Sequence, residues 1–120
     1  GTQAYSGAVT GTTSFSGTLV KQGAGTWVID QTFSSTRGVV IQAGQLQIGN
    51  SGTIGAIAGN VSNSGTLSFR RSDSITFAGT ISGTGRLVQS GSGALTLTGT
   101  NTYSGGTVVE AGTLVLSSVG

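Results

Sequence analysis

The chain has 120 residues, and 59 of them are glycine, serine or threonine. It contains no cysteine and no histidine, which excludes disulfide bonds, thiolate metal sites and histidine-assisted catalysis. Five Lys and Arg residues against three Asp and Glu residues give a net charge of +2, without the clustered basic face of a nucleic-acid binder. We therefore expect one domain over residues 1–120 that binds no nucleic acid, metal or cofactor.

Short strand-like phrases recur along the chain, each a small residue and a glycine followed by alternating apolar positions. Such alternation is typical of a strand with one buried face. The phrases follow one another at a nearly constant interval, except for one longer step between the third and the fourth, and a degenerate copy at Ser6–Gly11 precedes them. The clear copies are Ala24–Ile29, Ala43–Ile48, Ser64–Phe69, Ser92–Leu97 and Ala111–Leu116.

A longer repeat overlies the short one. The segment Leu19–Ile29 aligns with Leu87–Leu97, and Gly38–Ile48 aligns with Gly106–Leu116, both at the same offset and without a gap. Two segments that share one offset indicate an internal duplication, with repeat units 19–48 and 87–116.

A unit of about 20 residues with short strands is typical of one turn of a solenoid, in which each turn pairs in parallel with the turn below. The spacing predicts an all-β parallel coil of about six turns, a fragment of a longer coil, and roughly 29 Å long at about 4.8 Å per turn. We expect two inward columns: Trp27, Leu46, Leu67, Leu95 and Leu114 in one, and Ile29, Ile48, Phe69, Leu97 and Leu116 in the other.

A glycine precedes every alternation, which suggests that the chain turns a corner there. A corner requires either a positive φ or a close approach of two backbones, and glycine permits both. The alternative is that these are ordinary loop glycines, but their fixed position argues against it. They are Gly25, Gly44, Gly65, Gly93 and Gly112.

The segment Gly83–Ser118, "GTGRLVQSGSGALTLTGTNTYSGGTVVEAGTLVLSS", closely resembles the passenger-associated transport repeat of Gram-negative autotransporters. The earlier copy is degenerate, with Gln31–Phe33 where the later one has Gly99–Asn101. The resemblance implies a right-handed parallel β-helix at the cell surface or secreted, exported through the outer membrane by a C-terminal β-barrel translocator. The repeats of such passengers are thought to assist export by folding outside the cell.

The sequence offers little for catalysis. The three acids Asp30, Asp73 and Glu110 match no motif, although a glycosidase needs only two carboxylates held roughly 5–10 Å apart. We interpret these acids as solvated outer-face or turn residues and expect that the chain is not an enzyme.

Two non-enzymatic functions fit the pattern. The first is a structural stem that supports translocation and extracellular folding. The second is an adhesin or self-association module that contacts another copy, another cell or a host-surface ligand.

The second function needs a patch of interacting side chains on the outer face of the coil. The candidate interaction loop contains Arg70, Arg71 and Asp73. The longer step between phrases spans this loop, which suggests an insertion at one edge of the coil; the simpler interpretation is a solvated excursion.

Overall fold

The computed structural model describes residues 2–5, 18–29, 38–53, 59–99 and 101–116. These residues form thirteen β-strands and no helix, and all of the strand pairs are parallel. The first sheet contains β1 (Thr2–Tyr5), β2 (Thr18–Lys21), β4 (Val39–Ile41), β6 (Val61–Asn63) and β9 (Ile81–Ser82). The second contains β3 (Thr26–Ile29), β5 (Gln45–Gly52), β7 (Thr66–Arg71), β10 (Arg86–Gln89) and β12 (Thr107–Val109). The third contains β8 (Ile75–Phe77), β11 (Ala94–Leu97) and β13 (Thr113–Leu116).

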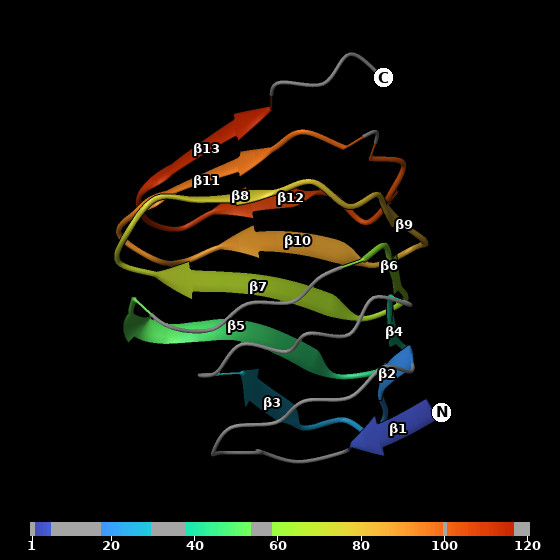
Figure 1. Ribbon diagram of the computed structural model, residues 1–120. Helices are drawn as coiled ribbons and strands as arrows, with labels where there is room; N and C mark the ends of the chain where they lie inside the picture. The colour runs from blue at the N-terminus through green and yellow to red at the C-terminus, as the bar shows by residue number, and fades with distance from the viewer. Residues whose placement is uncertain (1, 6–17, 30–37, 54–58, 100, 117–120) are drawn as a thin grey trace.

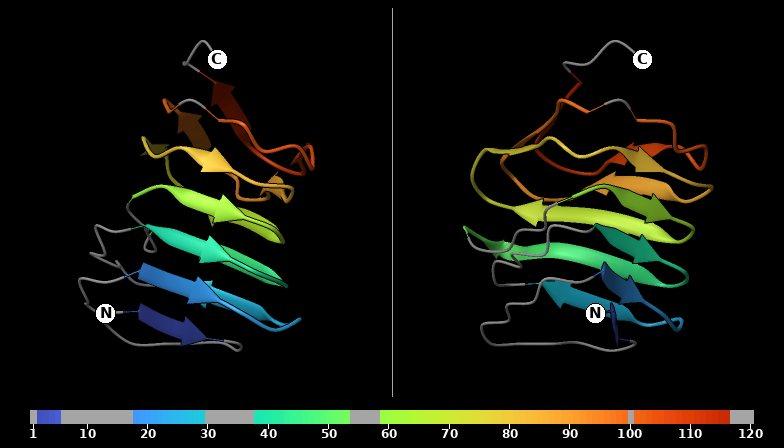
Figure 2. Two further views of the ribbon diagram at one scale, coloured as in Figure 1. Left: turned by 90° about the vertical axis from the view of Figure 1, so that its right-hand side faces the viewer. Right: turned by 45° about the vertical axis from the view of Figure 1, so that its right-hand side comes forward.

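The three sheets are the sides of one coil, which the chain climbs from the N-terminus to the C-terminus (Figure 1). One turn runs through β6, β7 and β8, and the next through β9, β10 and β11. The coil is right-handed, as parallel crossovers almost always are, and Figure 2 shows the first sheet face-on. The predicted parallel β-helix is confirmed.

The number of turns is smaller than expected. The first and second sheets each contain five strands, so four steps from turn to turn separate their ends. The described residues therefore make about four turns of a coil rather than six. The expected sixth copy at Ser6–Gly11 lies outside the described residues.

Alternation along each strand builds the core. In β3, Trp27 and Ile29 are fully buried, whereas Thr26 is exposed. The same pattern in every turn stacks apolar side chains inside the coil, and their transfer from water is the main favourable contribution to folding. The core contains Trp27, Ile29, Val39, Ile41, Leu46, Ile48, Val61, Leu67, Phe69, Phe77, Ile81, Leu87, Leu95 and Leu97.

The inward columns differ from the expected ones after the third member. Trp27, Leu46 and Leu67 stack as predicted, but the next residue above Leu67 in the second sheet is Leu87 rather than Leu95. Leu95 instead lies between Ile75 and Leu114 in the third sheet. The second column divides in the same way: Ile29, Ile48 and Phe69 continue with Gln89 and Val109, while Leu97 stacks with Phe77 and Leu116.

This division explains both spacings found in the sequence. Leu67 pairs with Leu87 one turn later, and Leu95 follows on the next side of the coil. The longer step between the third and fourth phrases is therefore one turn plus one side. The offset between the two copies of the long repeat has the same explanation. Three turns lead from Trp27 to Leu87 in the second sheet, and one further side of the coil leads to Leu95 in the third. The first copy thus turns between the first and second sheets, and the second copy turns between the second and third.

Glycine is required at the corner position that the two copies share. Gly44 and Gly112 occupy this position in the first and second copy, and both have positive φ, +70° and +66°. A Cβ at either position would also collide with two carbonyl oxygens of the turn below. Any other residue would combine backbone strain with a steric clash.

Candidate functional site

A polar hollow lies on the outer face of the second sheet, over β5, β7 and β10. Its floor is the outward column formed by Gln47, Ser68 and Val88, which pair in register across three successive turns. These side chains alternate with the buried core residues of the same strands, so they point to the opposite face of the sheet. Their exposed fractions are only 7%, 2% and 7%, because taller side chains stand on both sides of them.

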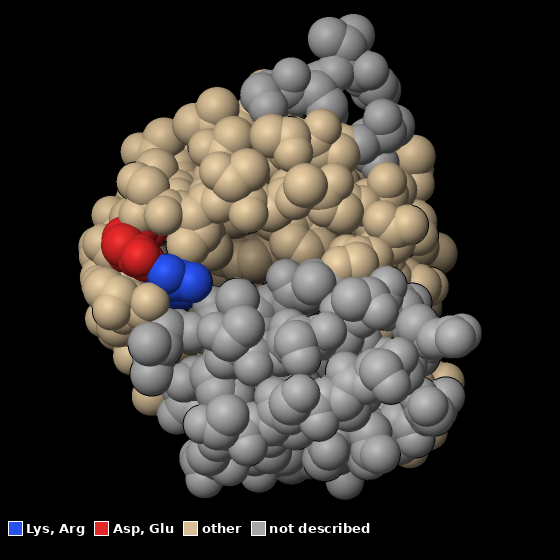
Figure 3. Space-filling model, viewed as in Figure 1, with Lys and Arg blue, Asp and Glu red and all other residues tan. Residues whose placement is uncertain are grey.

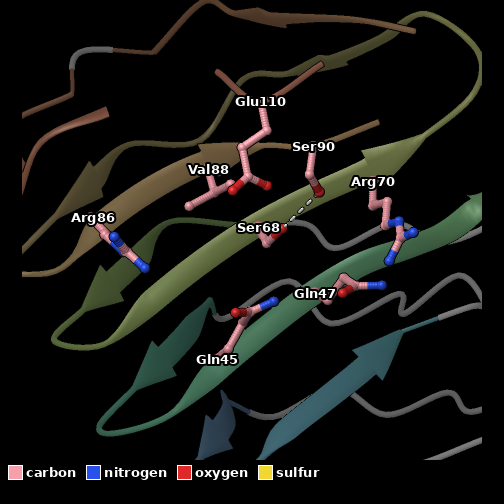
Figure 4. Close-up of a pocket in the computed structure, with 8 residues that line it drawn as sticks. All are labelled: Gln45, Gln47, Ser68, Arg70, Arg86, Val88, Ser90 and Glu110. Carbon is pink, nitrogen blue, oxygen red and sulfur yellow. Dashed lines mark hydrogen bonds between the residues drawn. The ribbon is translucent and has the colours of Figure 1, made fainter. Parts of the chain in front are cut away.

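Two further outward columns form the walls of the hollow. Gln45 and Arg86 both pair with Thr66 and so share one column, at the N-terminal ends of the strands. Arg70, Ser90 and Glu110 line the hollow from the C-terminal ends (Figure 4). The hollow measures about 320 Å³, within the range of small-ligand sites.

Hydrogen bonds hold the floor in place. The Gln47 Nε2 atom donates to the carbonyl oxygen of Gly49 over 2.9 Å, and the Ser68 and Ser90 hydroxyls share a hydrogen bond of 3.3 Å. Both kinds of side chain line the hollow (Figure 4), and each can form more hydrogen bonds than these. The floor therefore presents two fixed, neutral hydrogen-bonding side chains, Gln47 and Ser68, beside the apolar Val88.

The charges of the hollow are separate from one another. Arg70, Arg86 and Glu110 are all exposed, and within the described ranges none of them forms an ion pair. Arg70 lies four residues beyond the pairing partner of Arg86, which separates the two Cα atoms by roughly 13 Å along the strand direction. The two guanidinium groups consequently stand at opposite ends of the hollow with free donors (Figure 4).

The predicted interaction loop is divided by the structure. Arg71 turns away from the hollow and forms a bidentate pair with Asp73, with N–O distances of 2.9 and 2.7 Å, and it also donates to the carbonyl oxygen of Thr53. The hydrogen bonds from Arg71 hold the pKa of the Asp73 carboxyl below its ordinary value. Of the three loop residues, only Arg70 contributes to the hollow.

The loop is also not an insertion. The corner from β7 to β8 matches the corner from β10 to β11 one turn later, because Phe69 pairs with Gln89 and Ile75 pairs with Leu95, so both corners have the same length. The long spacing that suggested an insertion is the shift of the repeated phrase to the next side of the coil. This corrects the interpretation drawn from the sequence.

Polar side chains also occupy the inside of the corners. The Lys21 Nζ atom donates to the carbonyl oxygens of Gln22, Gly23 and Ala43 over 2.6, 2.9 and 3.4 Å. At the corresponding place of the second copy, Gln89 donates to the carbonyl oxygens of Gly93 and Thr113. Each side chain thus joins its own corner to the corner of the next turn. Burial lowers the pKa of Lys21 below its ordinary value of 10.5.

The second copy contains two further structural side chains. The Asn101 Oδ1 atom accepts a hydrogen bond from the backbone N–H of Ile81, one turn below, over 3.0 Å. Tyr103 packs against the core, and its hydroxyl hydrogen-bonds to Thr107. These contacts give the asparagine and tyrosine of the repeat a role in stacking turns.

Sequence reasoning identified Arg70 but missed the other residues of the hollow. Arg86 and Glu110 are single charges in separate turns, and Gln47 and Ser68 resemble any other polar outward position. The phrase spacing aligns Gln47 with Ser68 but continues from Ser68 to Thr96, whereas a search for residues that recur once per turn would have continued to Val88.

In the described ranges, no helix is long and apolar enough to cross a membrane, and no three potential metal ligands lie together. The hollow offers hydrogen bonds and charge for binding. A parallel coil with an apolar interior and a polar outer face is a parallel β-helix.

The comparisons agree with that class. The family model of the passenger-associated-transport-repeat matches residues 19–48 and 87–116. The chain belongs to this family, and it is a segment of the secreted or surface-exposed passenger of a Gram-negative autotransporter. It is 49% identical over 85 residues, or 71% of its length, to the adhesin BmaC autotransporter of Brucella suis biovar 1 (strain 1330). The chain spans 2% of the length of that relative. No solved structure matches it significantly.

Proposed function

We propose that this segment is a structural stem of its passenger, which supports translocation by a C-terminal translocator and extracellular folding. The observation that carries the proposal is the unbroken pairing of the second sheet, in which every turn pairs directly with the turn before it. Each completed turn therefore presents a template for the next. Stability accumulates turn by turn, as in other solenoids.

Progressive folding of this kind is useful to a chain that emerges from a pore in order. A folded turn outside the cell cannot slip back, and it provides the edge on which the next turn adds. The segment needs no catalytic group for this role, and we propose that it is not an enzyme.

The test is to compare a whole-turn deletion with a half-turn deletion in the full-length protein. Removing residues 66–85 joins Gly65 to Arg86, and Arg86 then takes the place of Thr66, its pairing partner, above Gln45. Removing residues 66–75 instead joins Gly65 to Thr76 and puts Gly79 in the core position of Phe69. Passenger on intact cells is measured with an antibody and by resistance to external protease.

We expect the whole-turn deletion to retain surface display and protease resistance, and the half-turn deletion to lose both. Equal display and equal resistance of the two variants would show that continuity of the coil is not what this segment contributes.

Adhesion is the second candidate function. It is supported by the hollow and by the name of the Brucella relative, which is called an adhesin. The whole-turn deletion also tests it, because residues 66–85 include Ser68 and Arg70 of the hollow. Loss of cell attachment with full surface display would favour adhesion over the stem.

A further inference from the structure

We infer that the hollow on the outer face of β5, β7 and β10 binds an acidic glycan, a polymer of hydroxylated sugars that carries carboxylate groups. This inference rests on the proposed placement of the segment outside the cell, and it assigns a ligand class to the hollow. The chemistry of the lining residues supports that class.

The hollow must recognise its ligand by side chains alone. Strands β7 and β10 are both paired on each edge, so their backbone N–H and C=O groups are not available to a peptide strand. Strand addition, a common mode of peptide recognition, is excluded at this place.

The lining also lacks the aromatic and exposed apolar anchors that are typical of sites for peptides and single-stranded nucleic acids. Its eight residues include no aromatic side chain, and the single apolar one, Val88, is 7% exposed. Protein partners are usually anchored by aromatic or other large side chains in apolar pockets, and single-stranded nucleic acids stack on aromatic rings. Neither kind of anchor is present among these lining residues.

What the lining does contain matches a sugar polymer. Gln45, Gln47, Ser68 and Ser90 provide amide and hydroxyl groups that both donate and accept, which suits ligand hydroxyls. Glu110 can only accept when ionised, so it suits a hydroxyl donor and disfavours an anion at its own position.

The two arginines add the requirement for negative charge. Arg70 and Arg86 stand at opposite ends of the hollow, and neither pairs with a carboxylate in the part of the chain that the structure describes. A guanidinium group binds carboxylate in a bidentate fork. Carboxylates on two separate sugars of one glycan chain would bind the two guanidinium groups, while the hydroxyls of the sugars in between lie over the floor of the hollow.

Among the described residues, the exposed guanidinium groups that form no ion pair lie on this side of the coil. In Figure 3, the visible surface of the described residues is uncharged except where one blue and one red group meet at its edge. Unpaired guanidinium groups of the described residues are found instead on the outer face of the second sheet.

The test measures binding of a fluorescent galacturonic acid hexasaccharide to the passenger that contains this segment. We expect the Arg70→Gln and Arg86→Gln variants each to bind roughly tenfold more weakly or worse, because each loses a charge-assisted fork. The Arg70→Lys variant retains the charge but loses the fork, so it should fall between wild type and Arg70→Gln.

Arg71→Gln is the matched control, since it removes the same charge one residue away from a side chain that points to Asp73 and Thr53. Its affinity should stay close to wild type. The methyl ester of the same hexasaccharide, which has the hydroxyls but no charge, should bind far more weakly.

Three results would overturn the inference: equal losses in Arg71→Gln and Arg70→Gln, equal binding of the ester, or tighter arginine-dependent binding of single-stranded DNA. Loss of surface display in the Arg70→Gln/Arg86→Gln variant would also overturn it, by showing a structural role. Absence of glycan binding with normal display would reject the ligand and leave the stem in place.

Discussion

Inside the largely apolar coil, where Asn63 is also buried, Lys21 and Gln89 place polar atoms at the corners. Both satisfy carbonyl oxygens that point inward where the chain changes direction, and those oxygens would otherwise be buried without a donor. The exposed fraction of Lys21 is 0%, and no carboxylate pairs with it within the described ranges. An ammonium group in this position costs more desolvation energy than the neutral amide of Gln89 does.

We predict that the free energy of unfolding rises with pH in the alkaline range because of Lys21. Burial lowers its pKa in the folded state, so between that value and the ordinary 10.5 the unfolded chain binds a proton that the folded chain has released. Raising the pH through this window therefore stabilises the folded state. Urea unfolding at neutral pH and just below 10.5 measures the difference.

The control is Lys21→Gln, which copies the residue found at the matching corner of the second copy. It should fold and should show a smaller rise over the same window. A rise of the same size in this variant would assign the effect to other groups.

At the scale of elements, the building unit is a strand, a corner and a second strand, and it is not tied to one side of the coil. The first copy uses β2 and β3 around a corner between the first and second sheets, and the second copy uses β10 and β11 around a corner between the second and third. The same phrase fits both places because both corners need a glycine with positive φ in the following turn, Gly44 in one and Gly112 in the other.

Glycine can be required for two reasons, a positive φ and a lack of space for a Cβ atom. Three glycine-to-alanine substitutions separate these two reasons. Gly44 has positive φ and no room for a Cβ, Gly106 has positive φ (+98°) and open space, and Gly52 has neither constraint. We expect Gly52→Ala to be neutral or stabilising by up to about 1 kcal/mol, and Gly106→Ala to cost about 1–2 kcal/mol. Gly44→Ala should cost more than Gly106→Ala, because the backbone must also move.

Chemical denaturation of the three variants gives the order directly. If Gly44→Ala and Gly106→Ala were equally destabilising, φ alone would set the cost and the close packing of corners would contribute nothing.

At the scale of the whole molecule, the coil is apolar inside and its last described turn is open. Val109 and Leu116 belong to the inward columns, yet their exposed fractions are 49% and 60%. Strands β12 and β13 each pair with a neighbour on one edge only among the described strands. An unpaired strand edge beside exposed apolar side chains recruits further strands.

We predict that the chain of residues 1–120 associates weakly end to end through this turn. Leu116→Ser should reduce association, because it removes apolar surface without changing the backbone, and added flanking turns should abolish it. Sedimentation velocity over a range of protein concentrations measures the effect.

Arg70→Glu is the lateral control, chosen in preference to a change at Arg71, which is already paired with Asp73. It should leave end-to-end association unchanged. If association survived the added turns and was lost in Arg70→Glu, the outer face would be carrying it, and self-association would replace the stem as the favoured function.

The sequence by itself determined the period, the buried positions and the class of fold. Alternation in each phrase identifies Trp27, Leu46 and Leu95 as inward, since a side chain on a strand has only two faces to choose from. Glycine before each phrase identifies the corners, because a side chain is excluded where two backbones approach closely or where φ is positive, as it is at Gly44 and Gly112. These are local properties, and each can be read from a few consecutive residues.

The tertiary structure decided which phrases stack on which and what they form together. The same phrase serves two sides of the coil, so its spacing alone could not show that Leu95 lies on Ile75 instead of Leu67. Only the register of one turn on the next decides that. The hollow has the same origin: Gln47, Ser68 and Arg86 come from three successive turns, and hydrogen bonding between strands, a long-range interaction, brings them to one place.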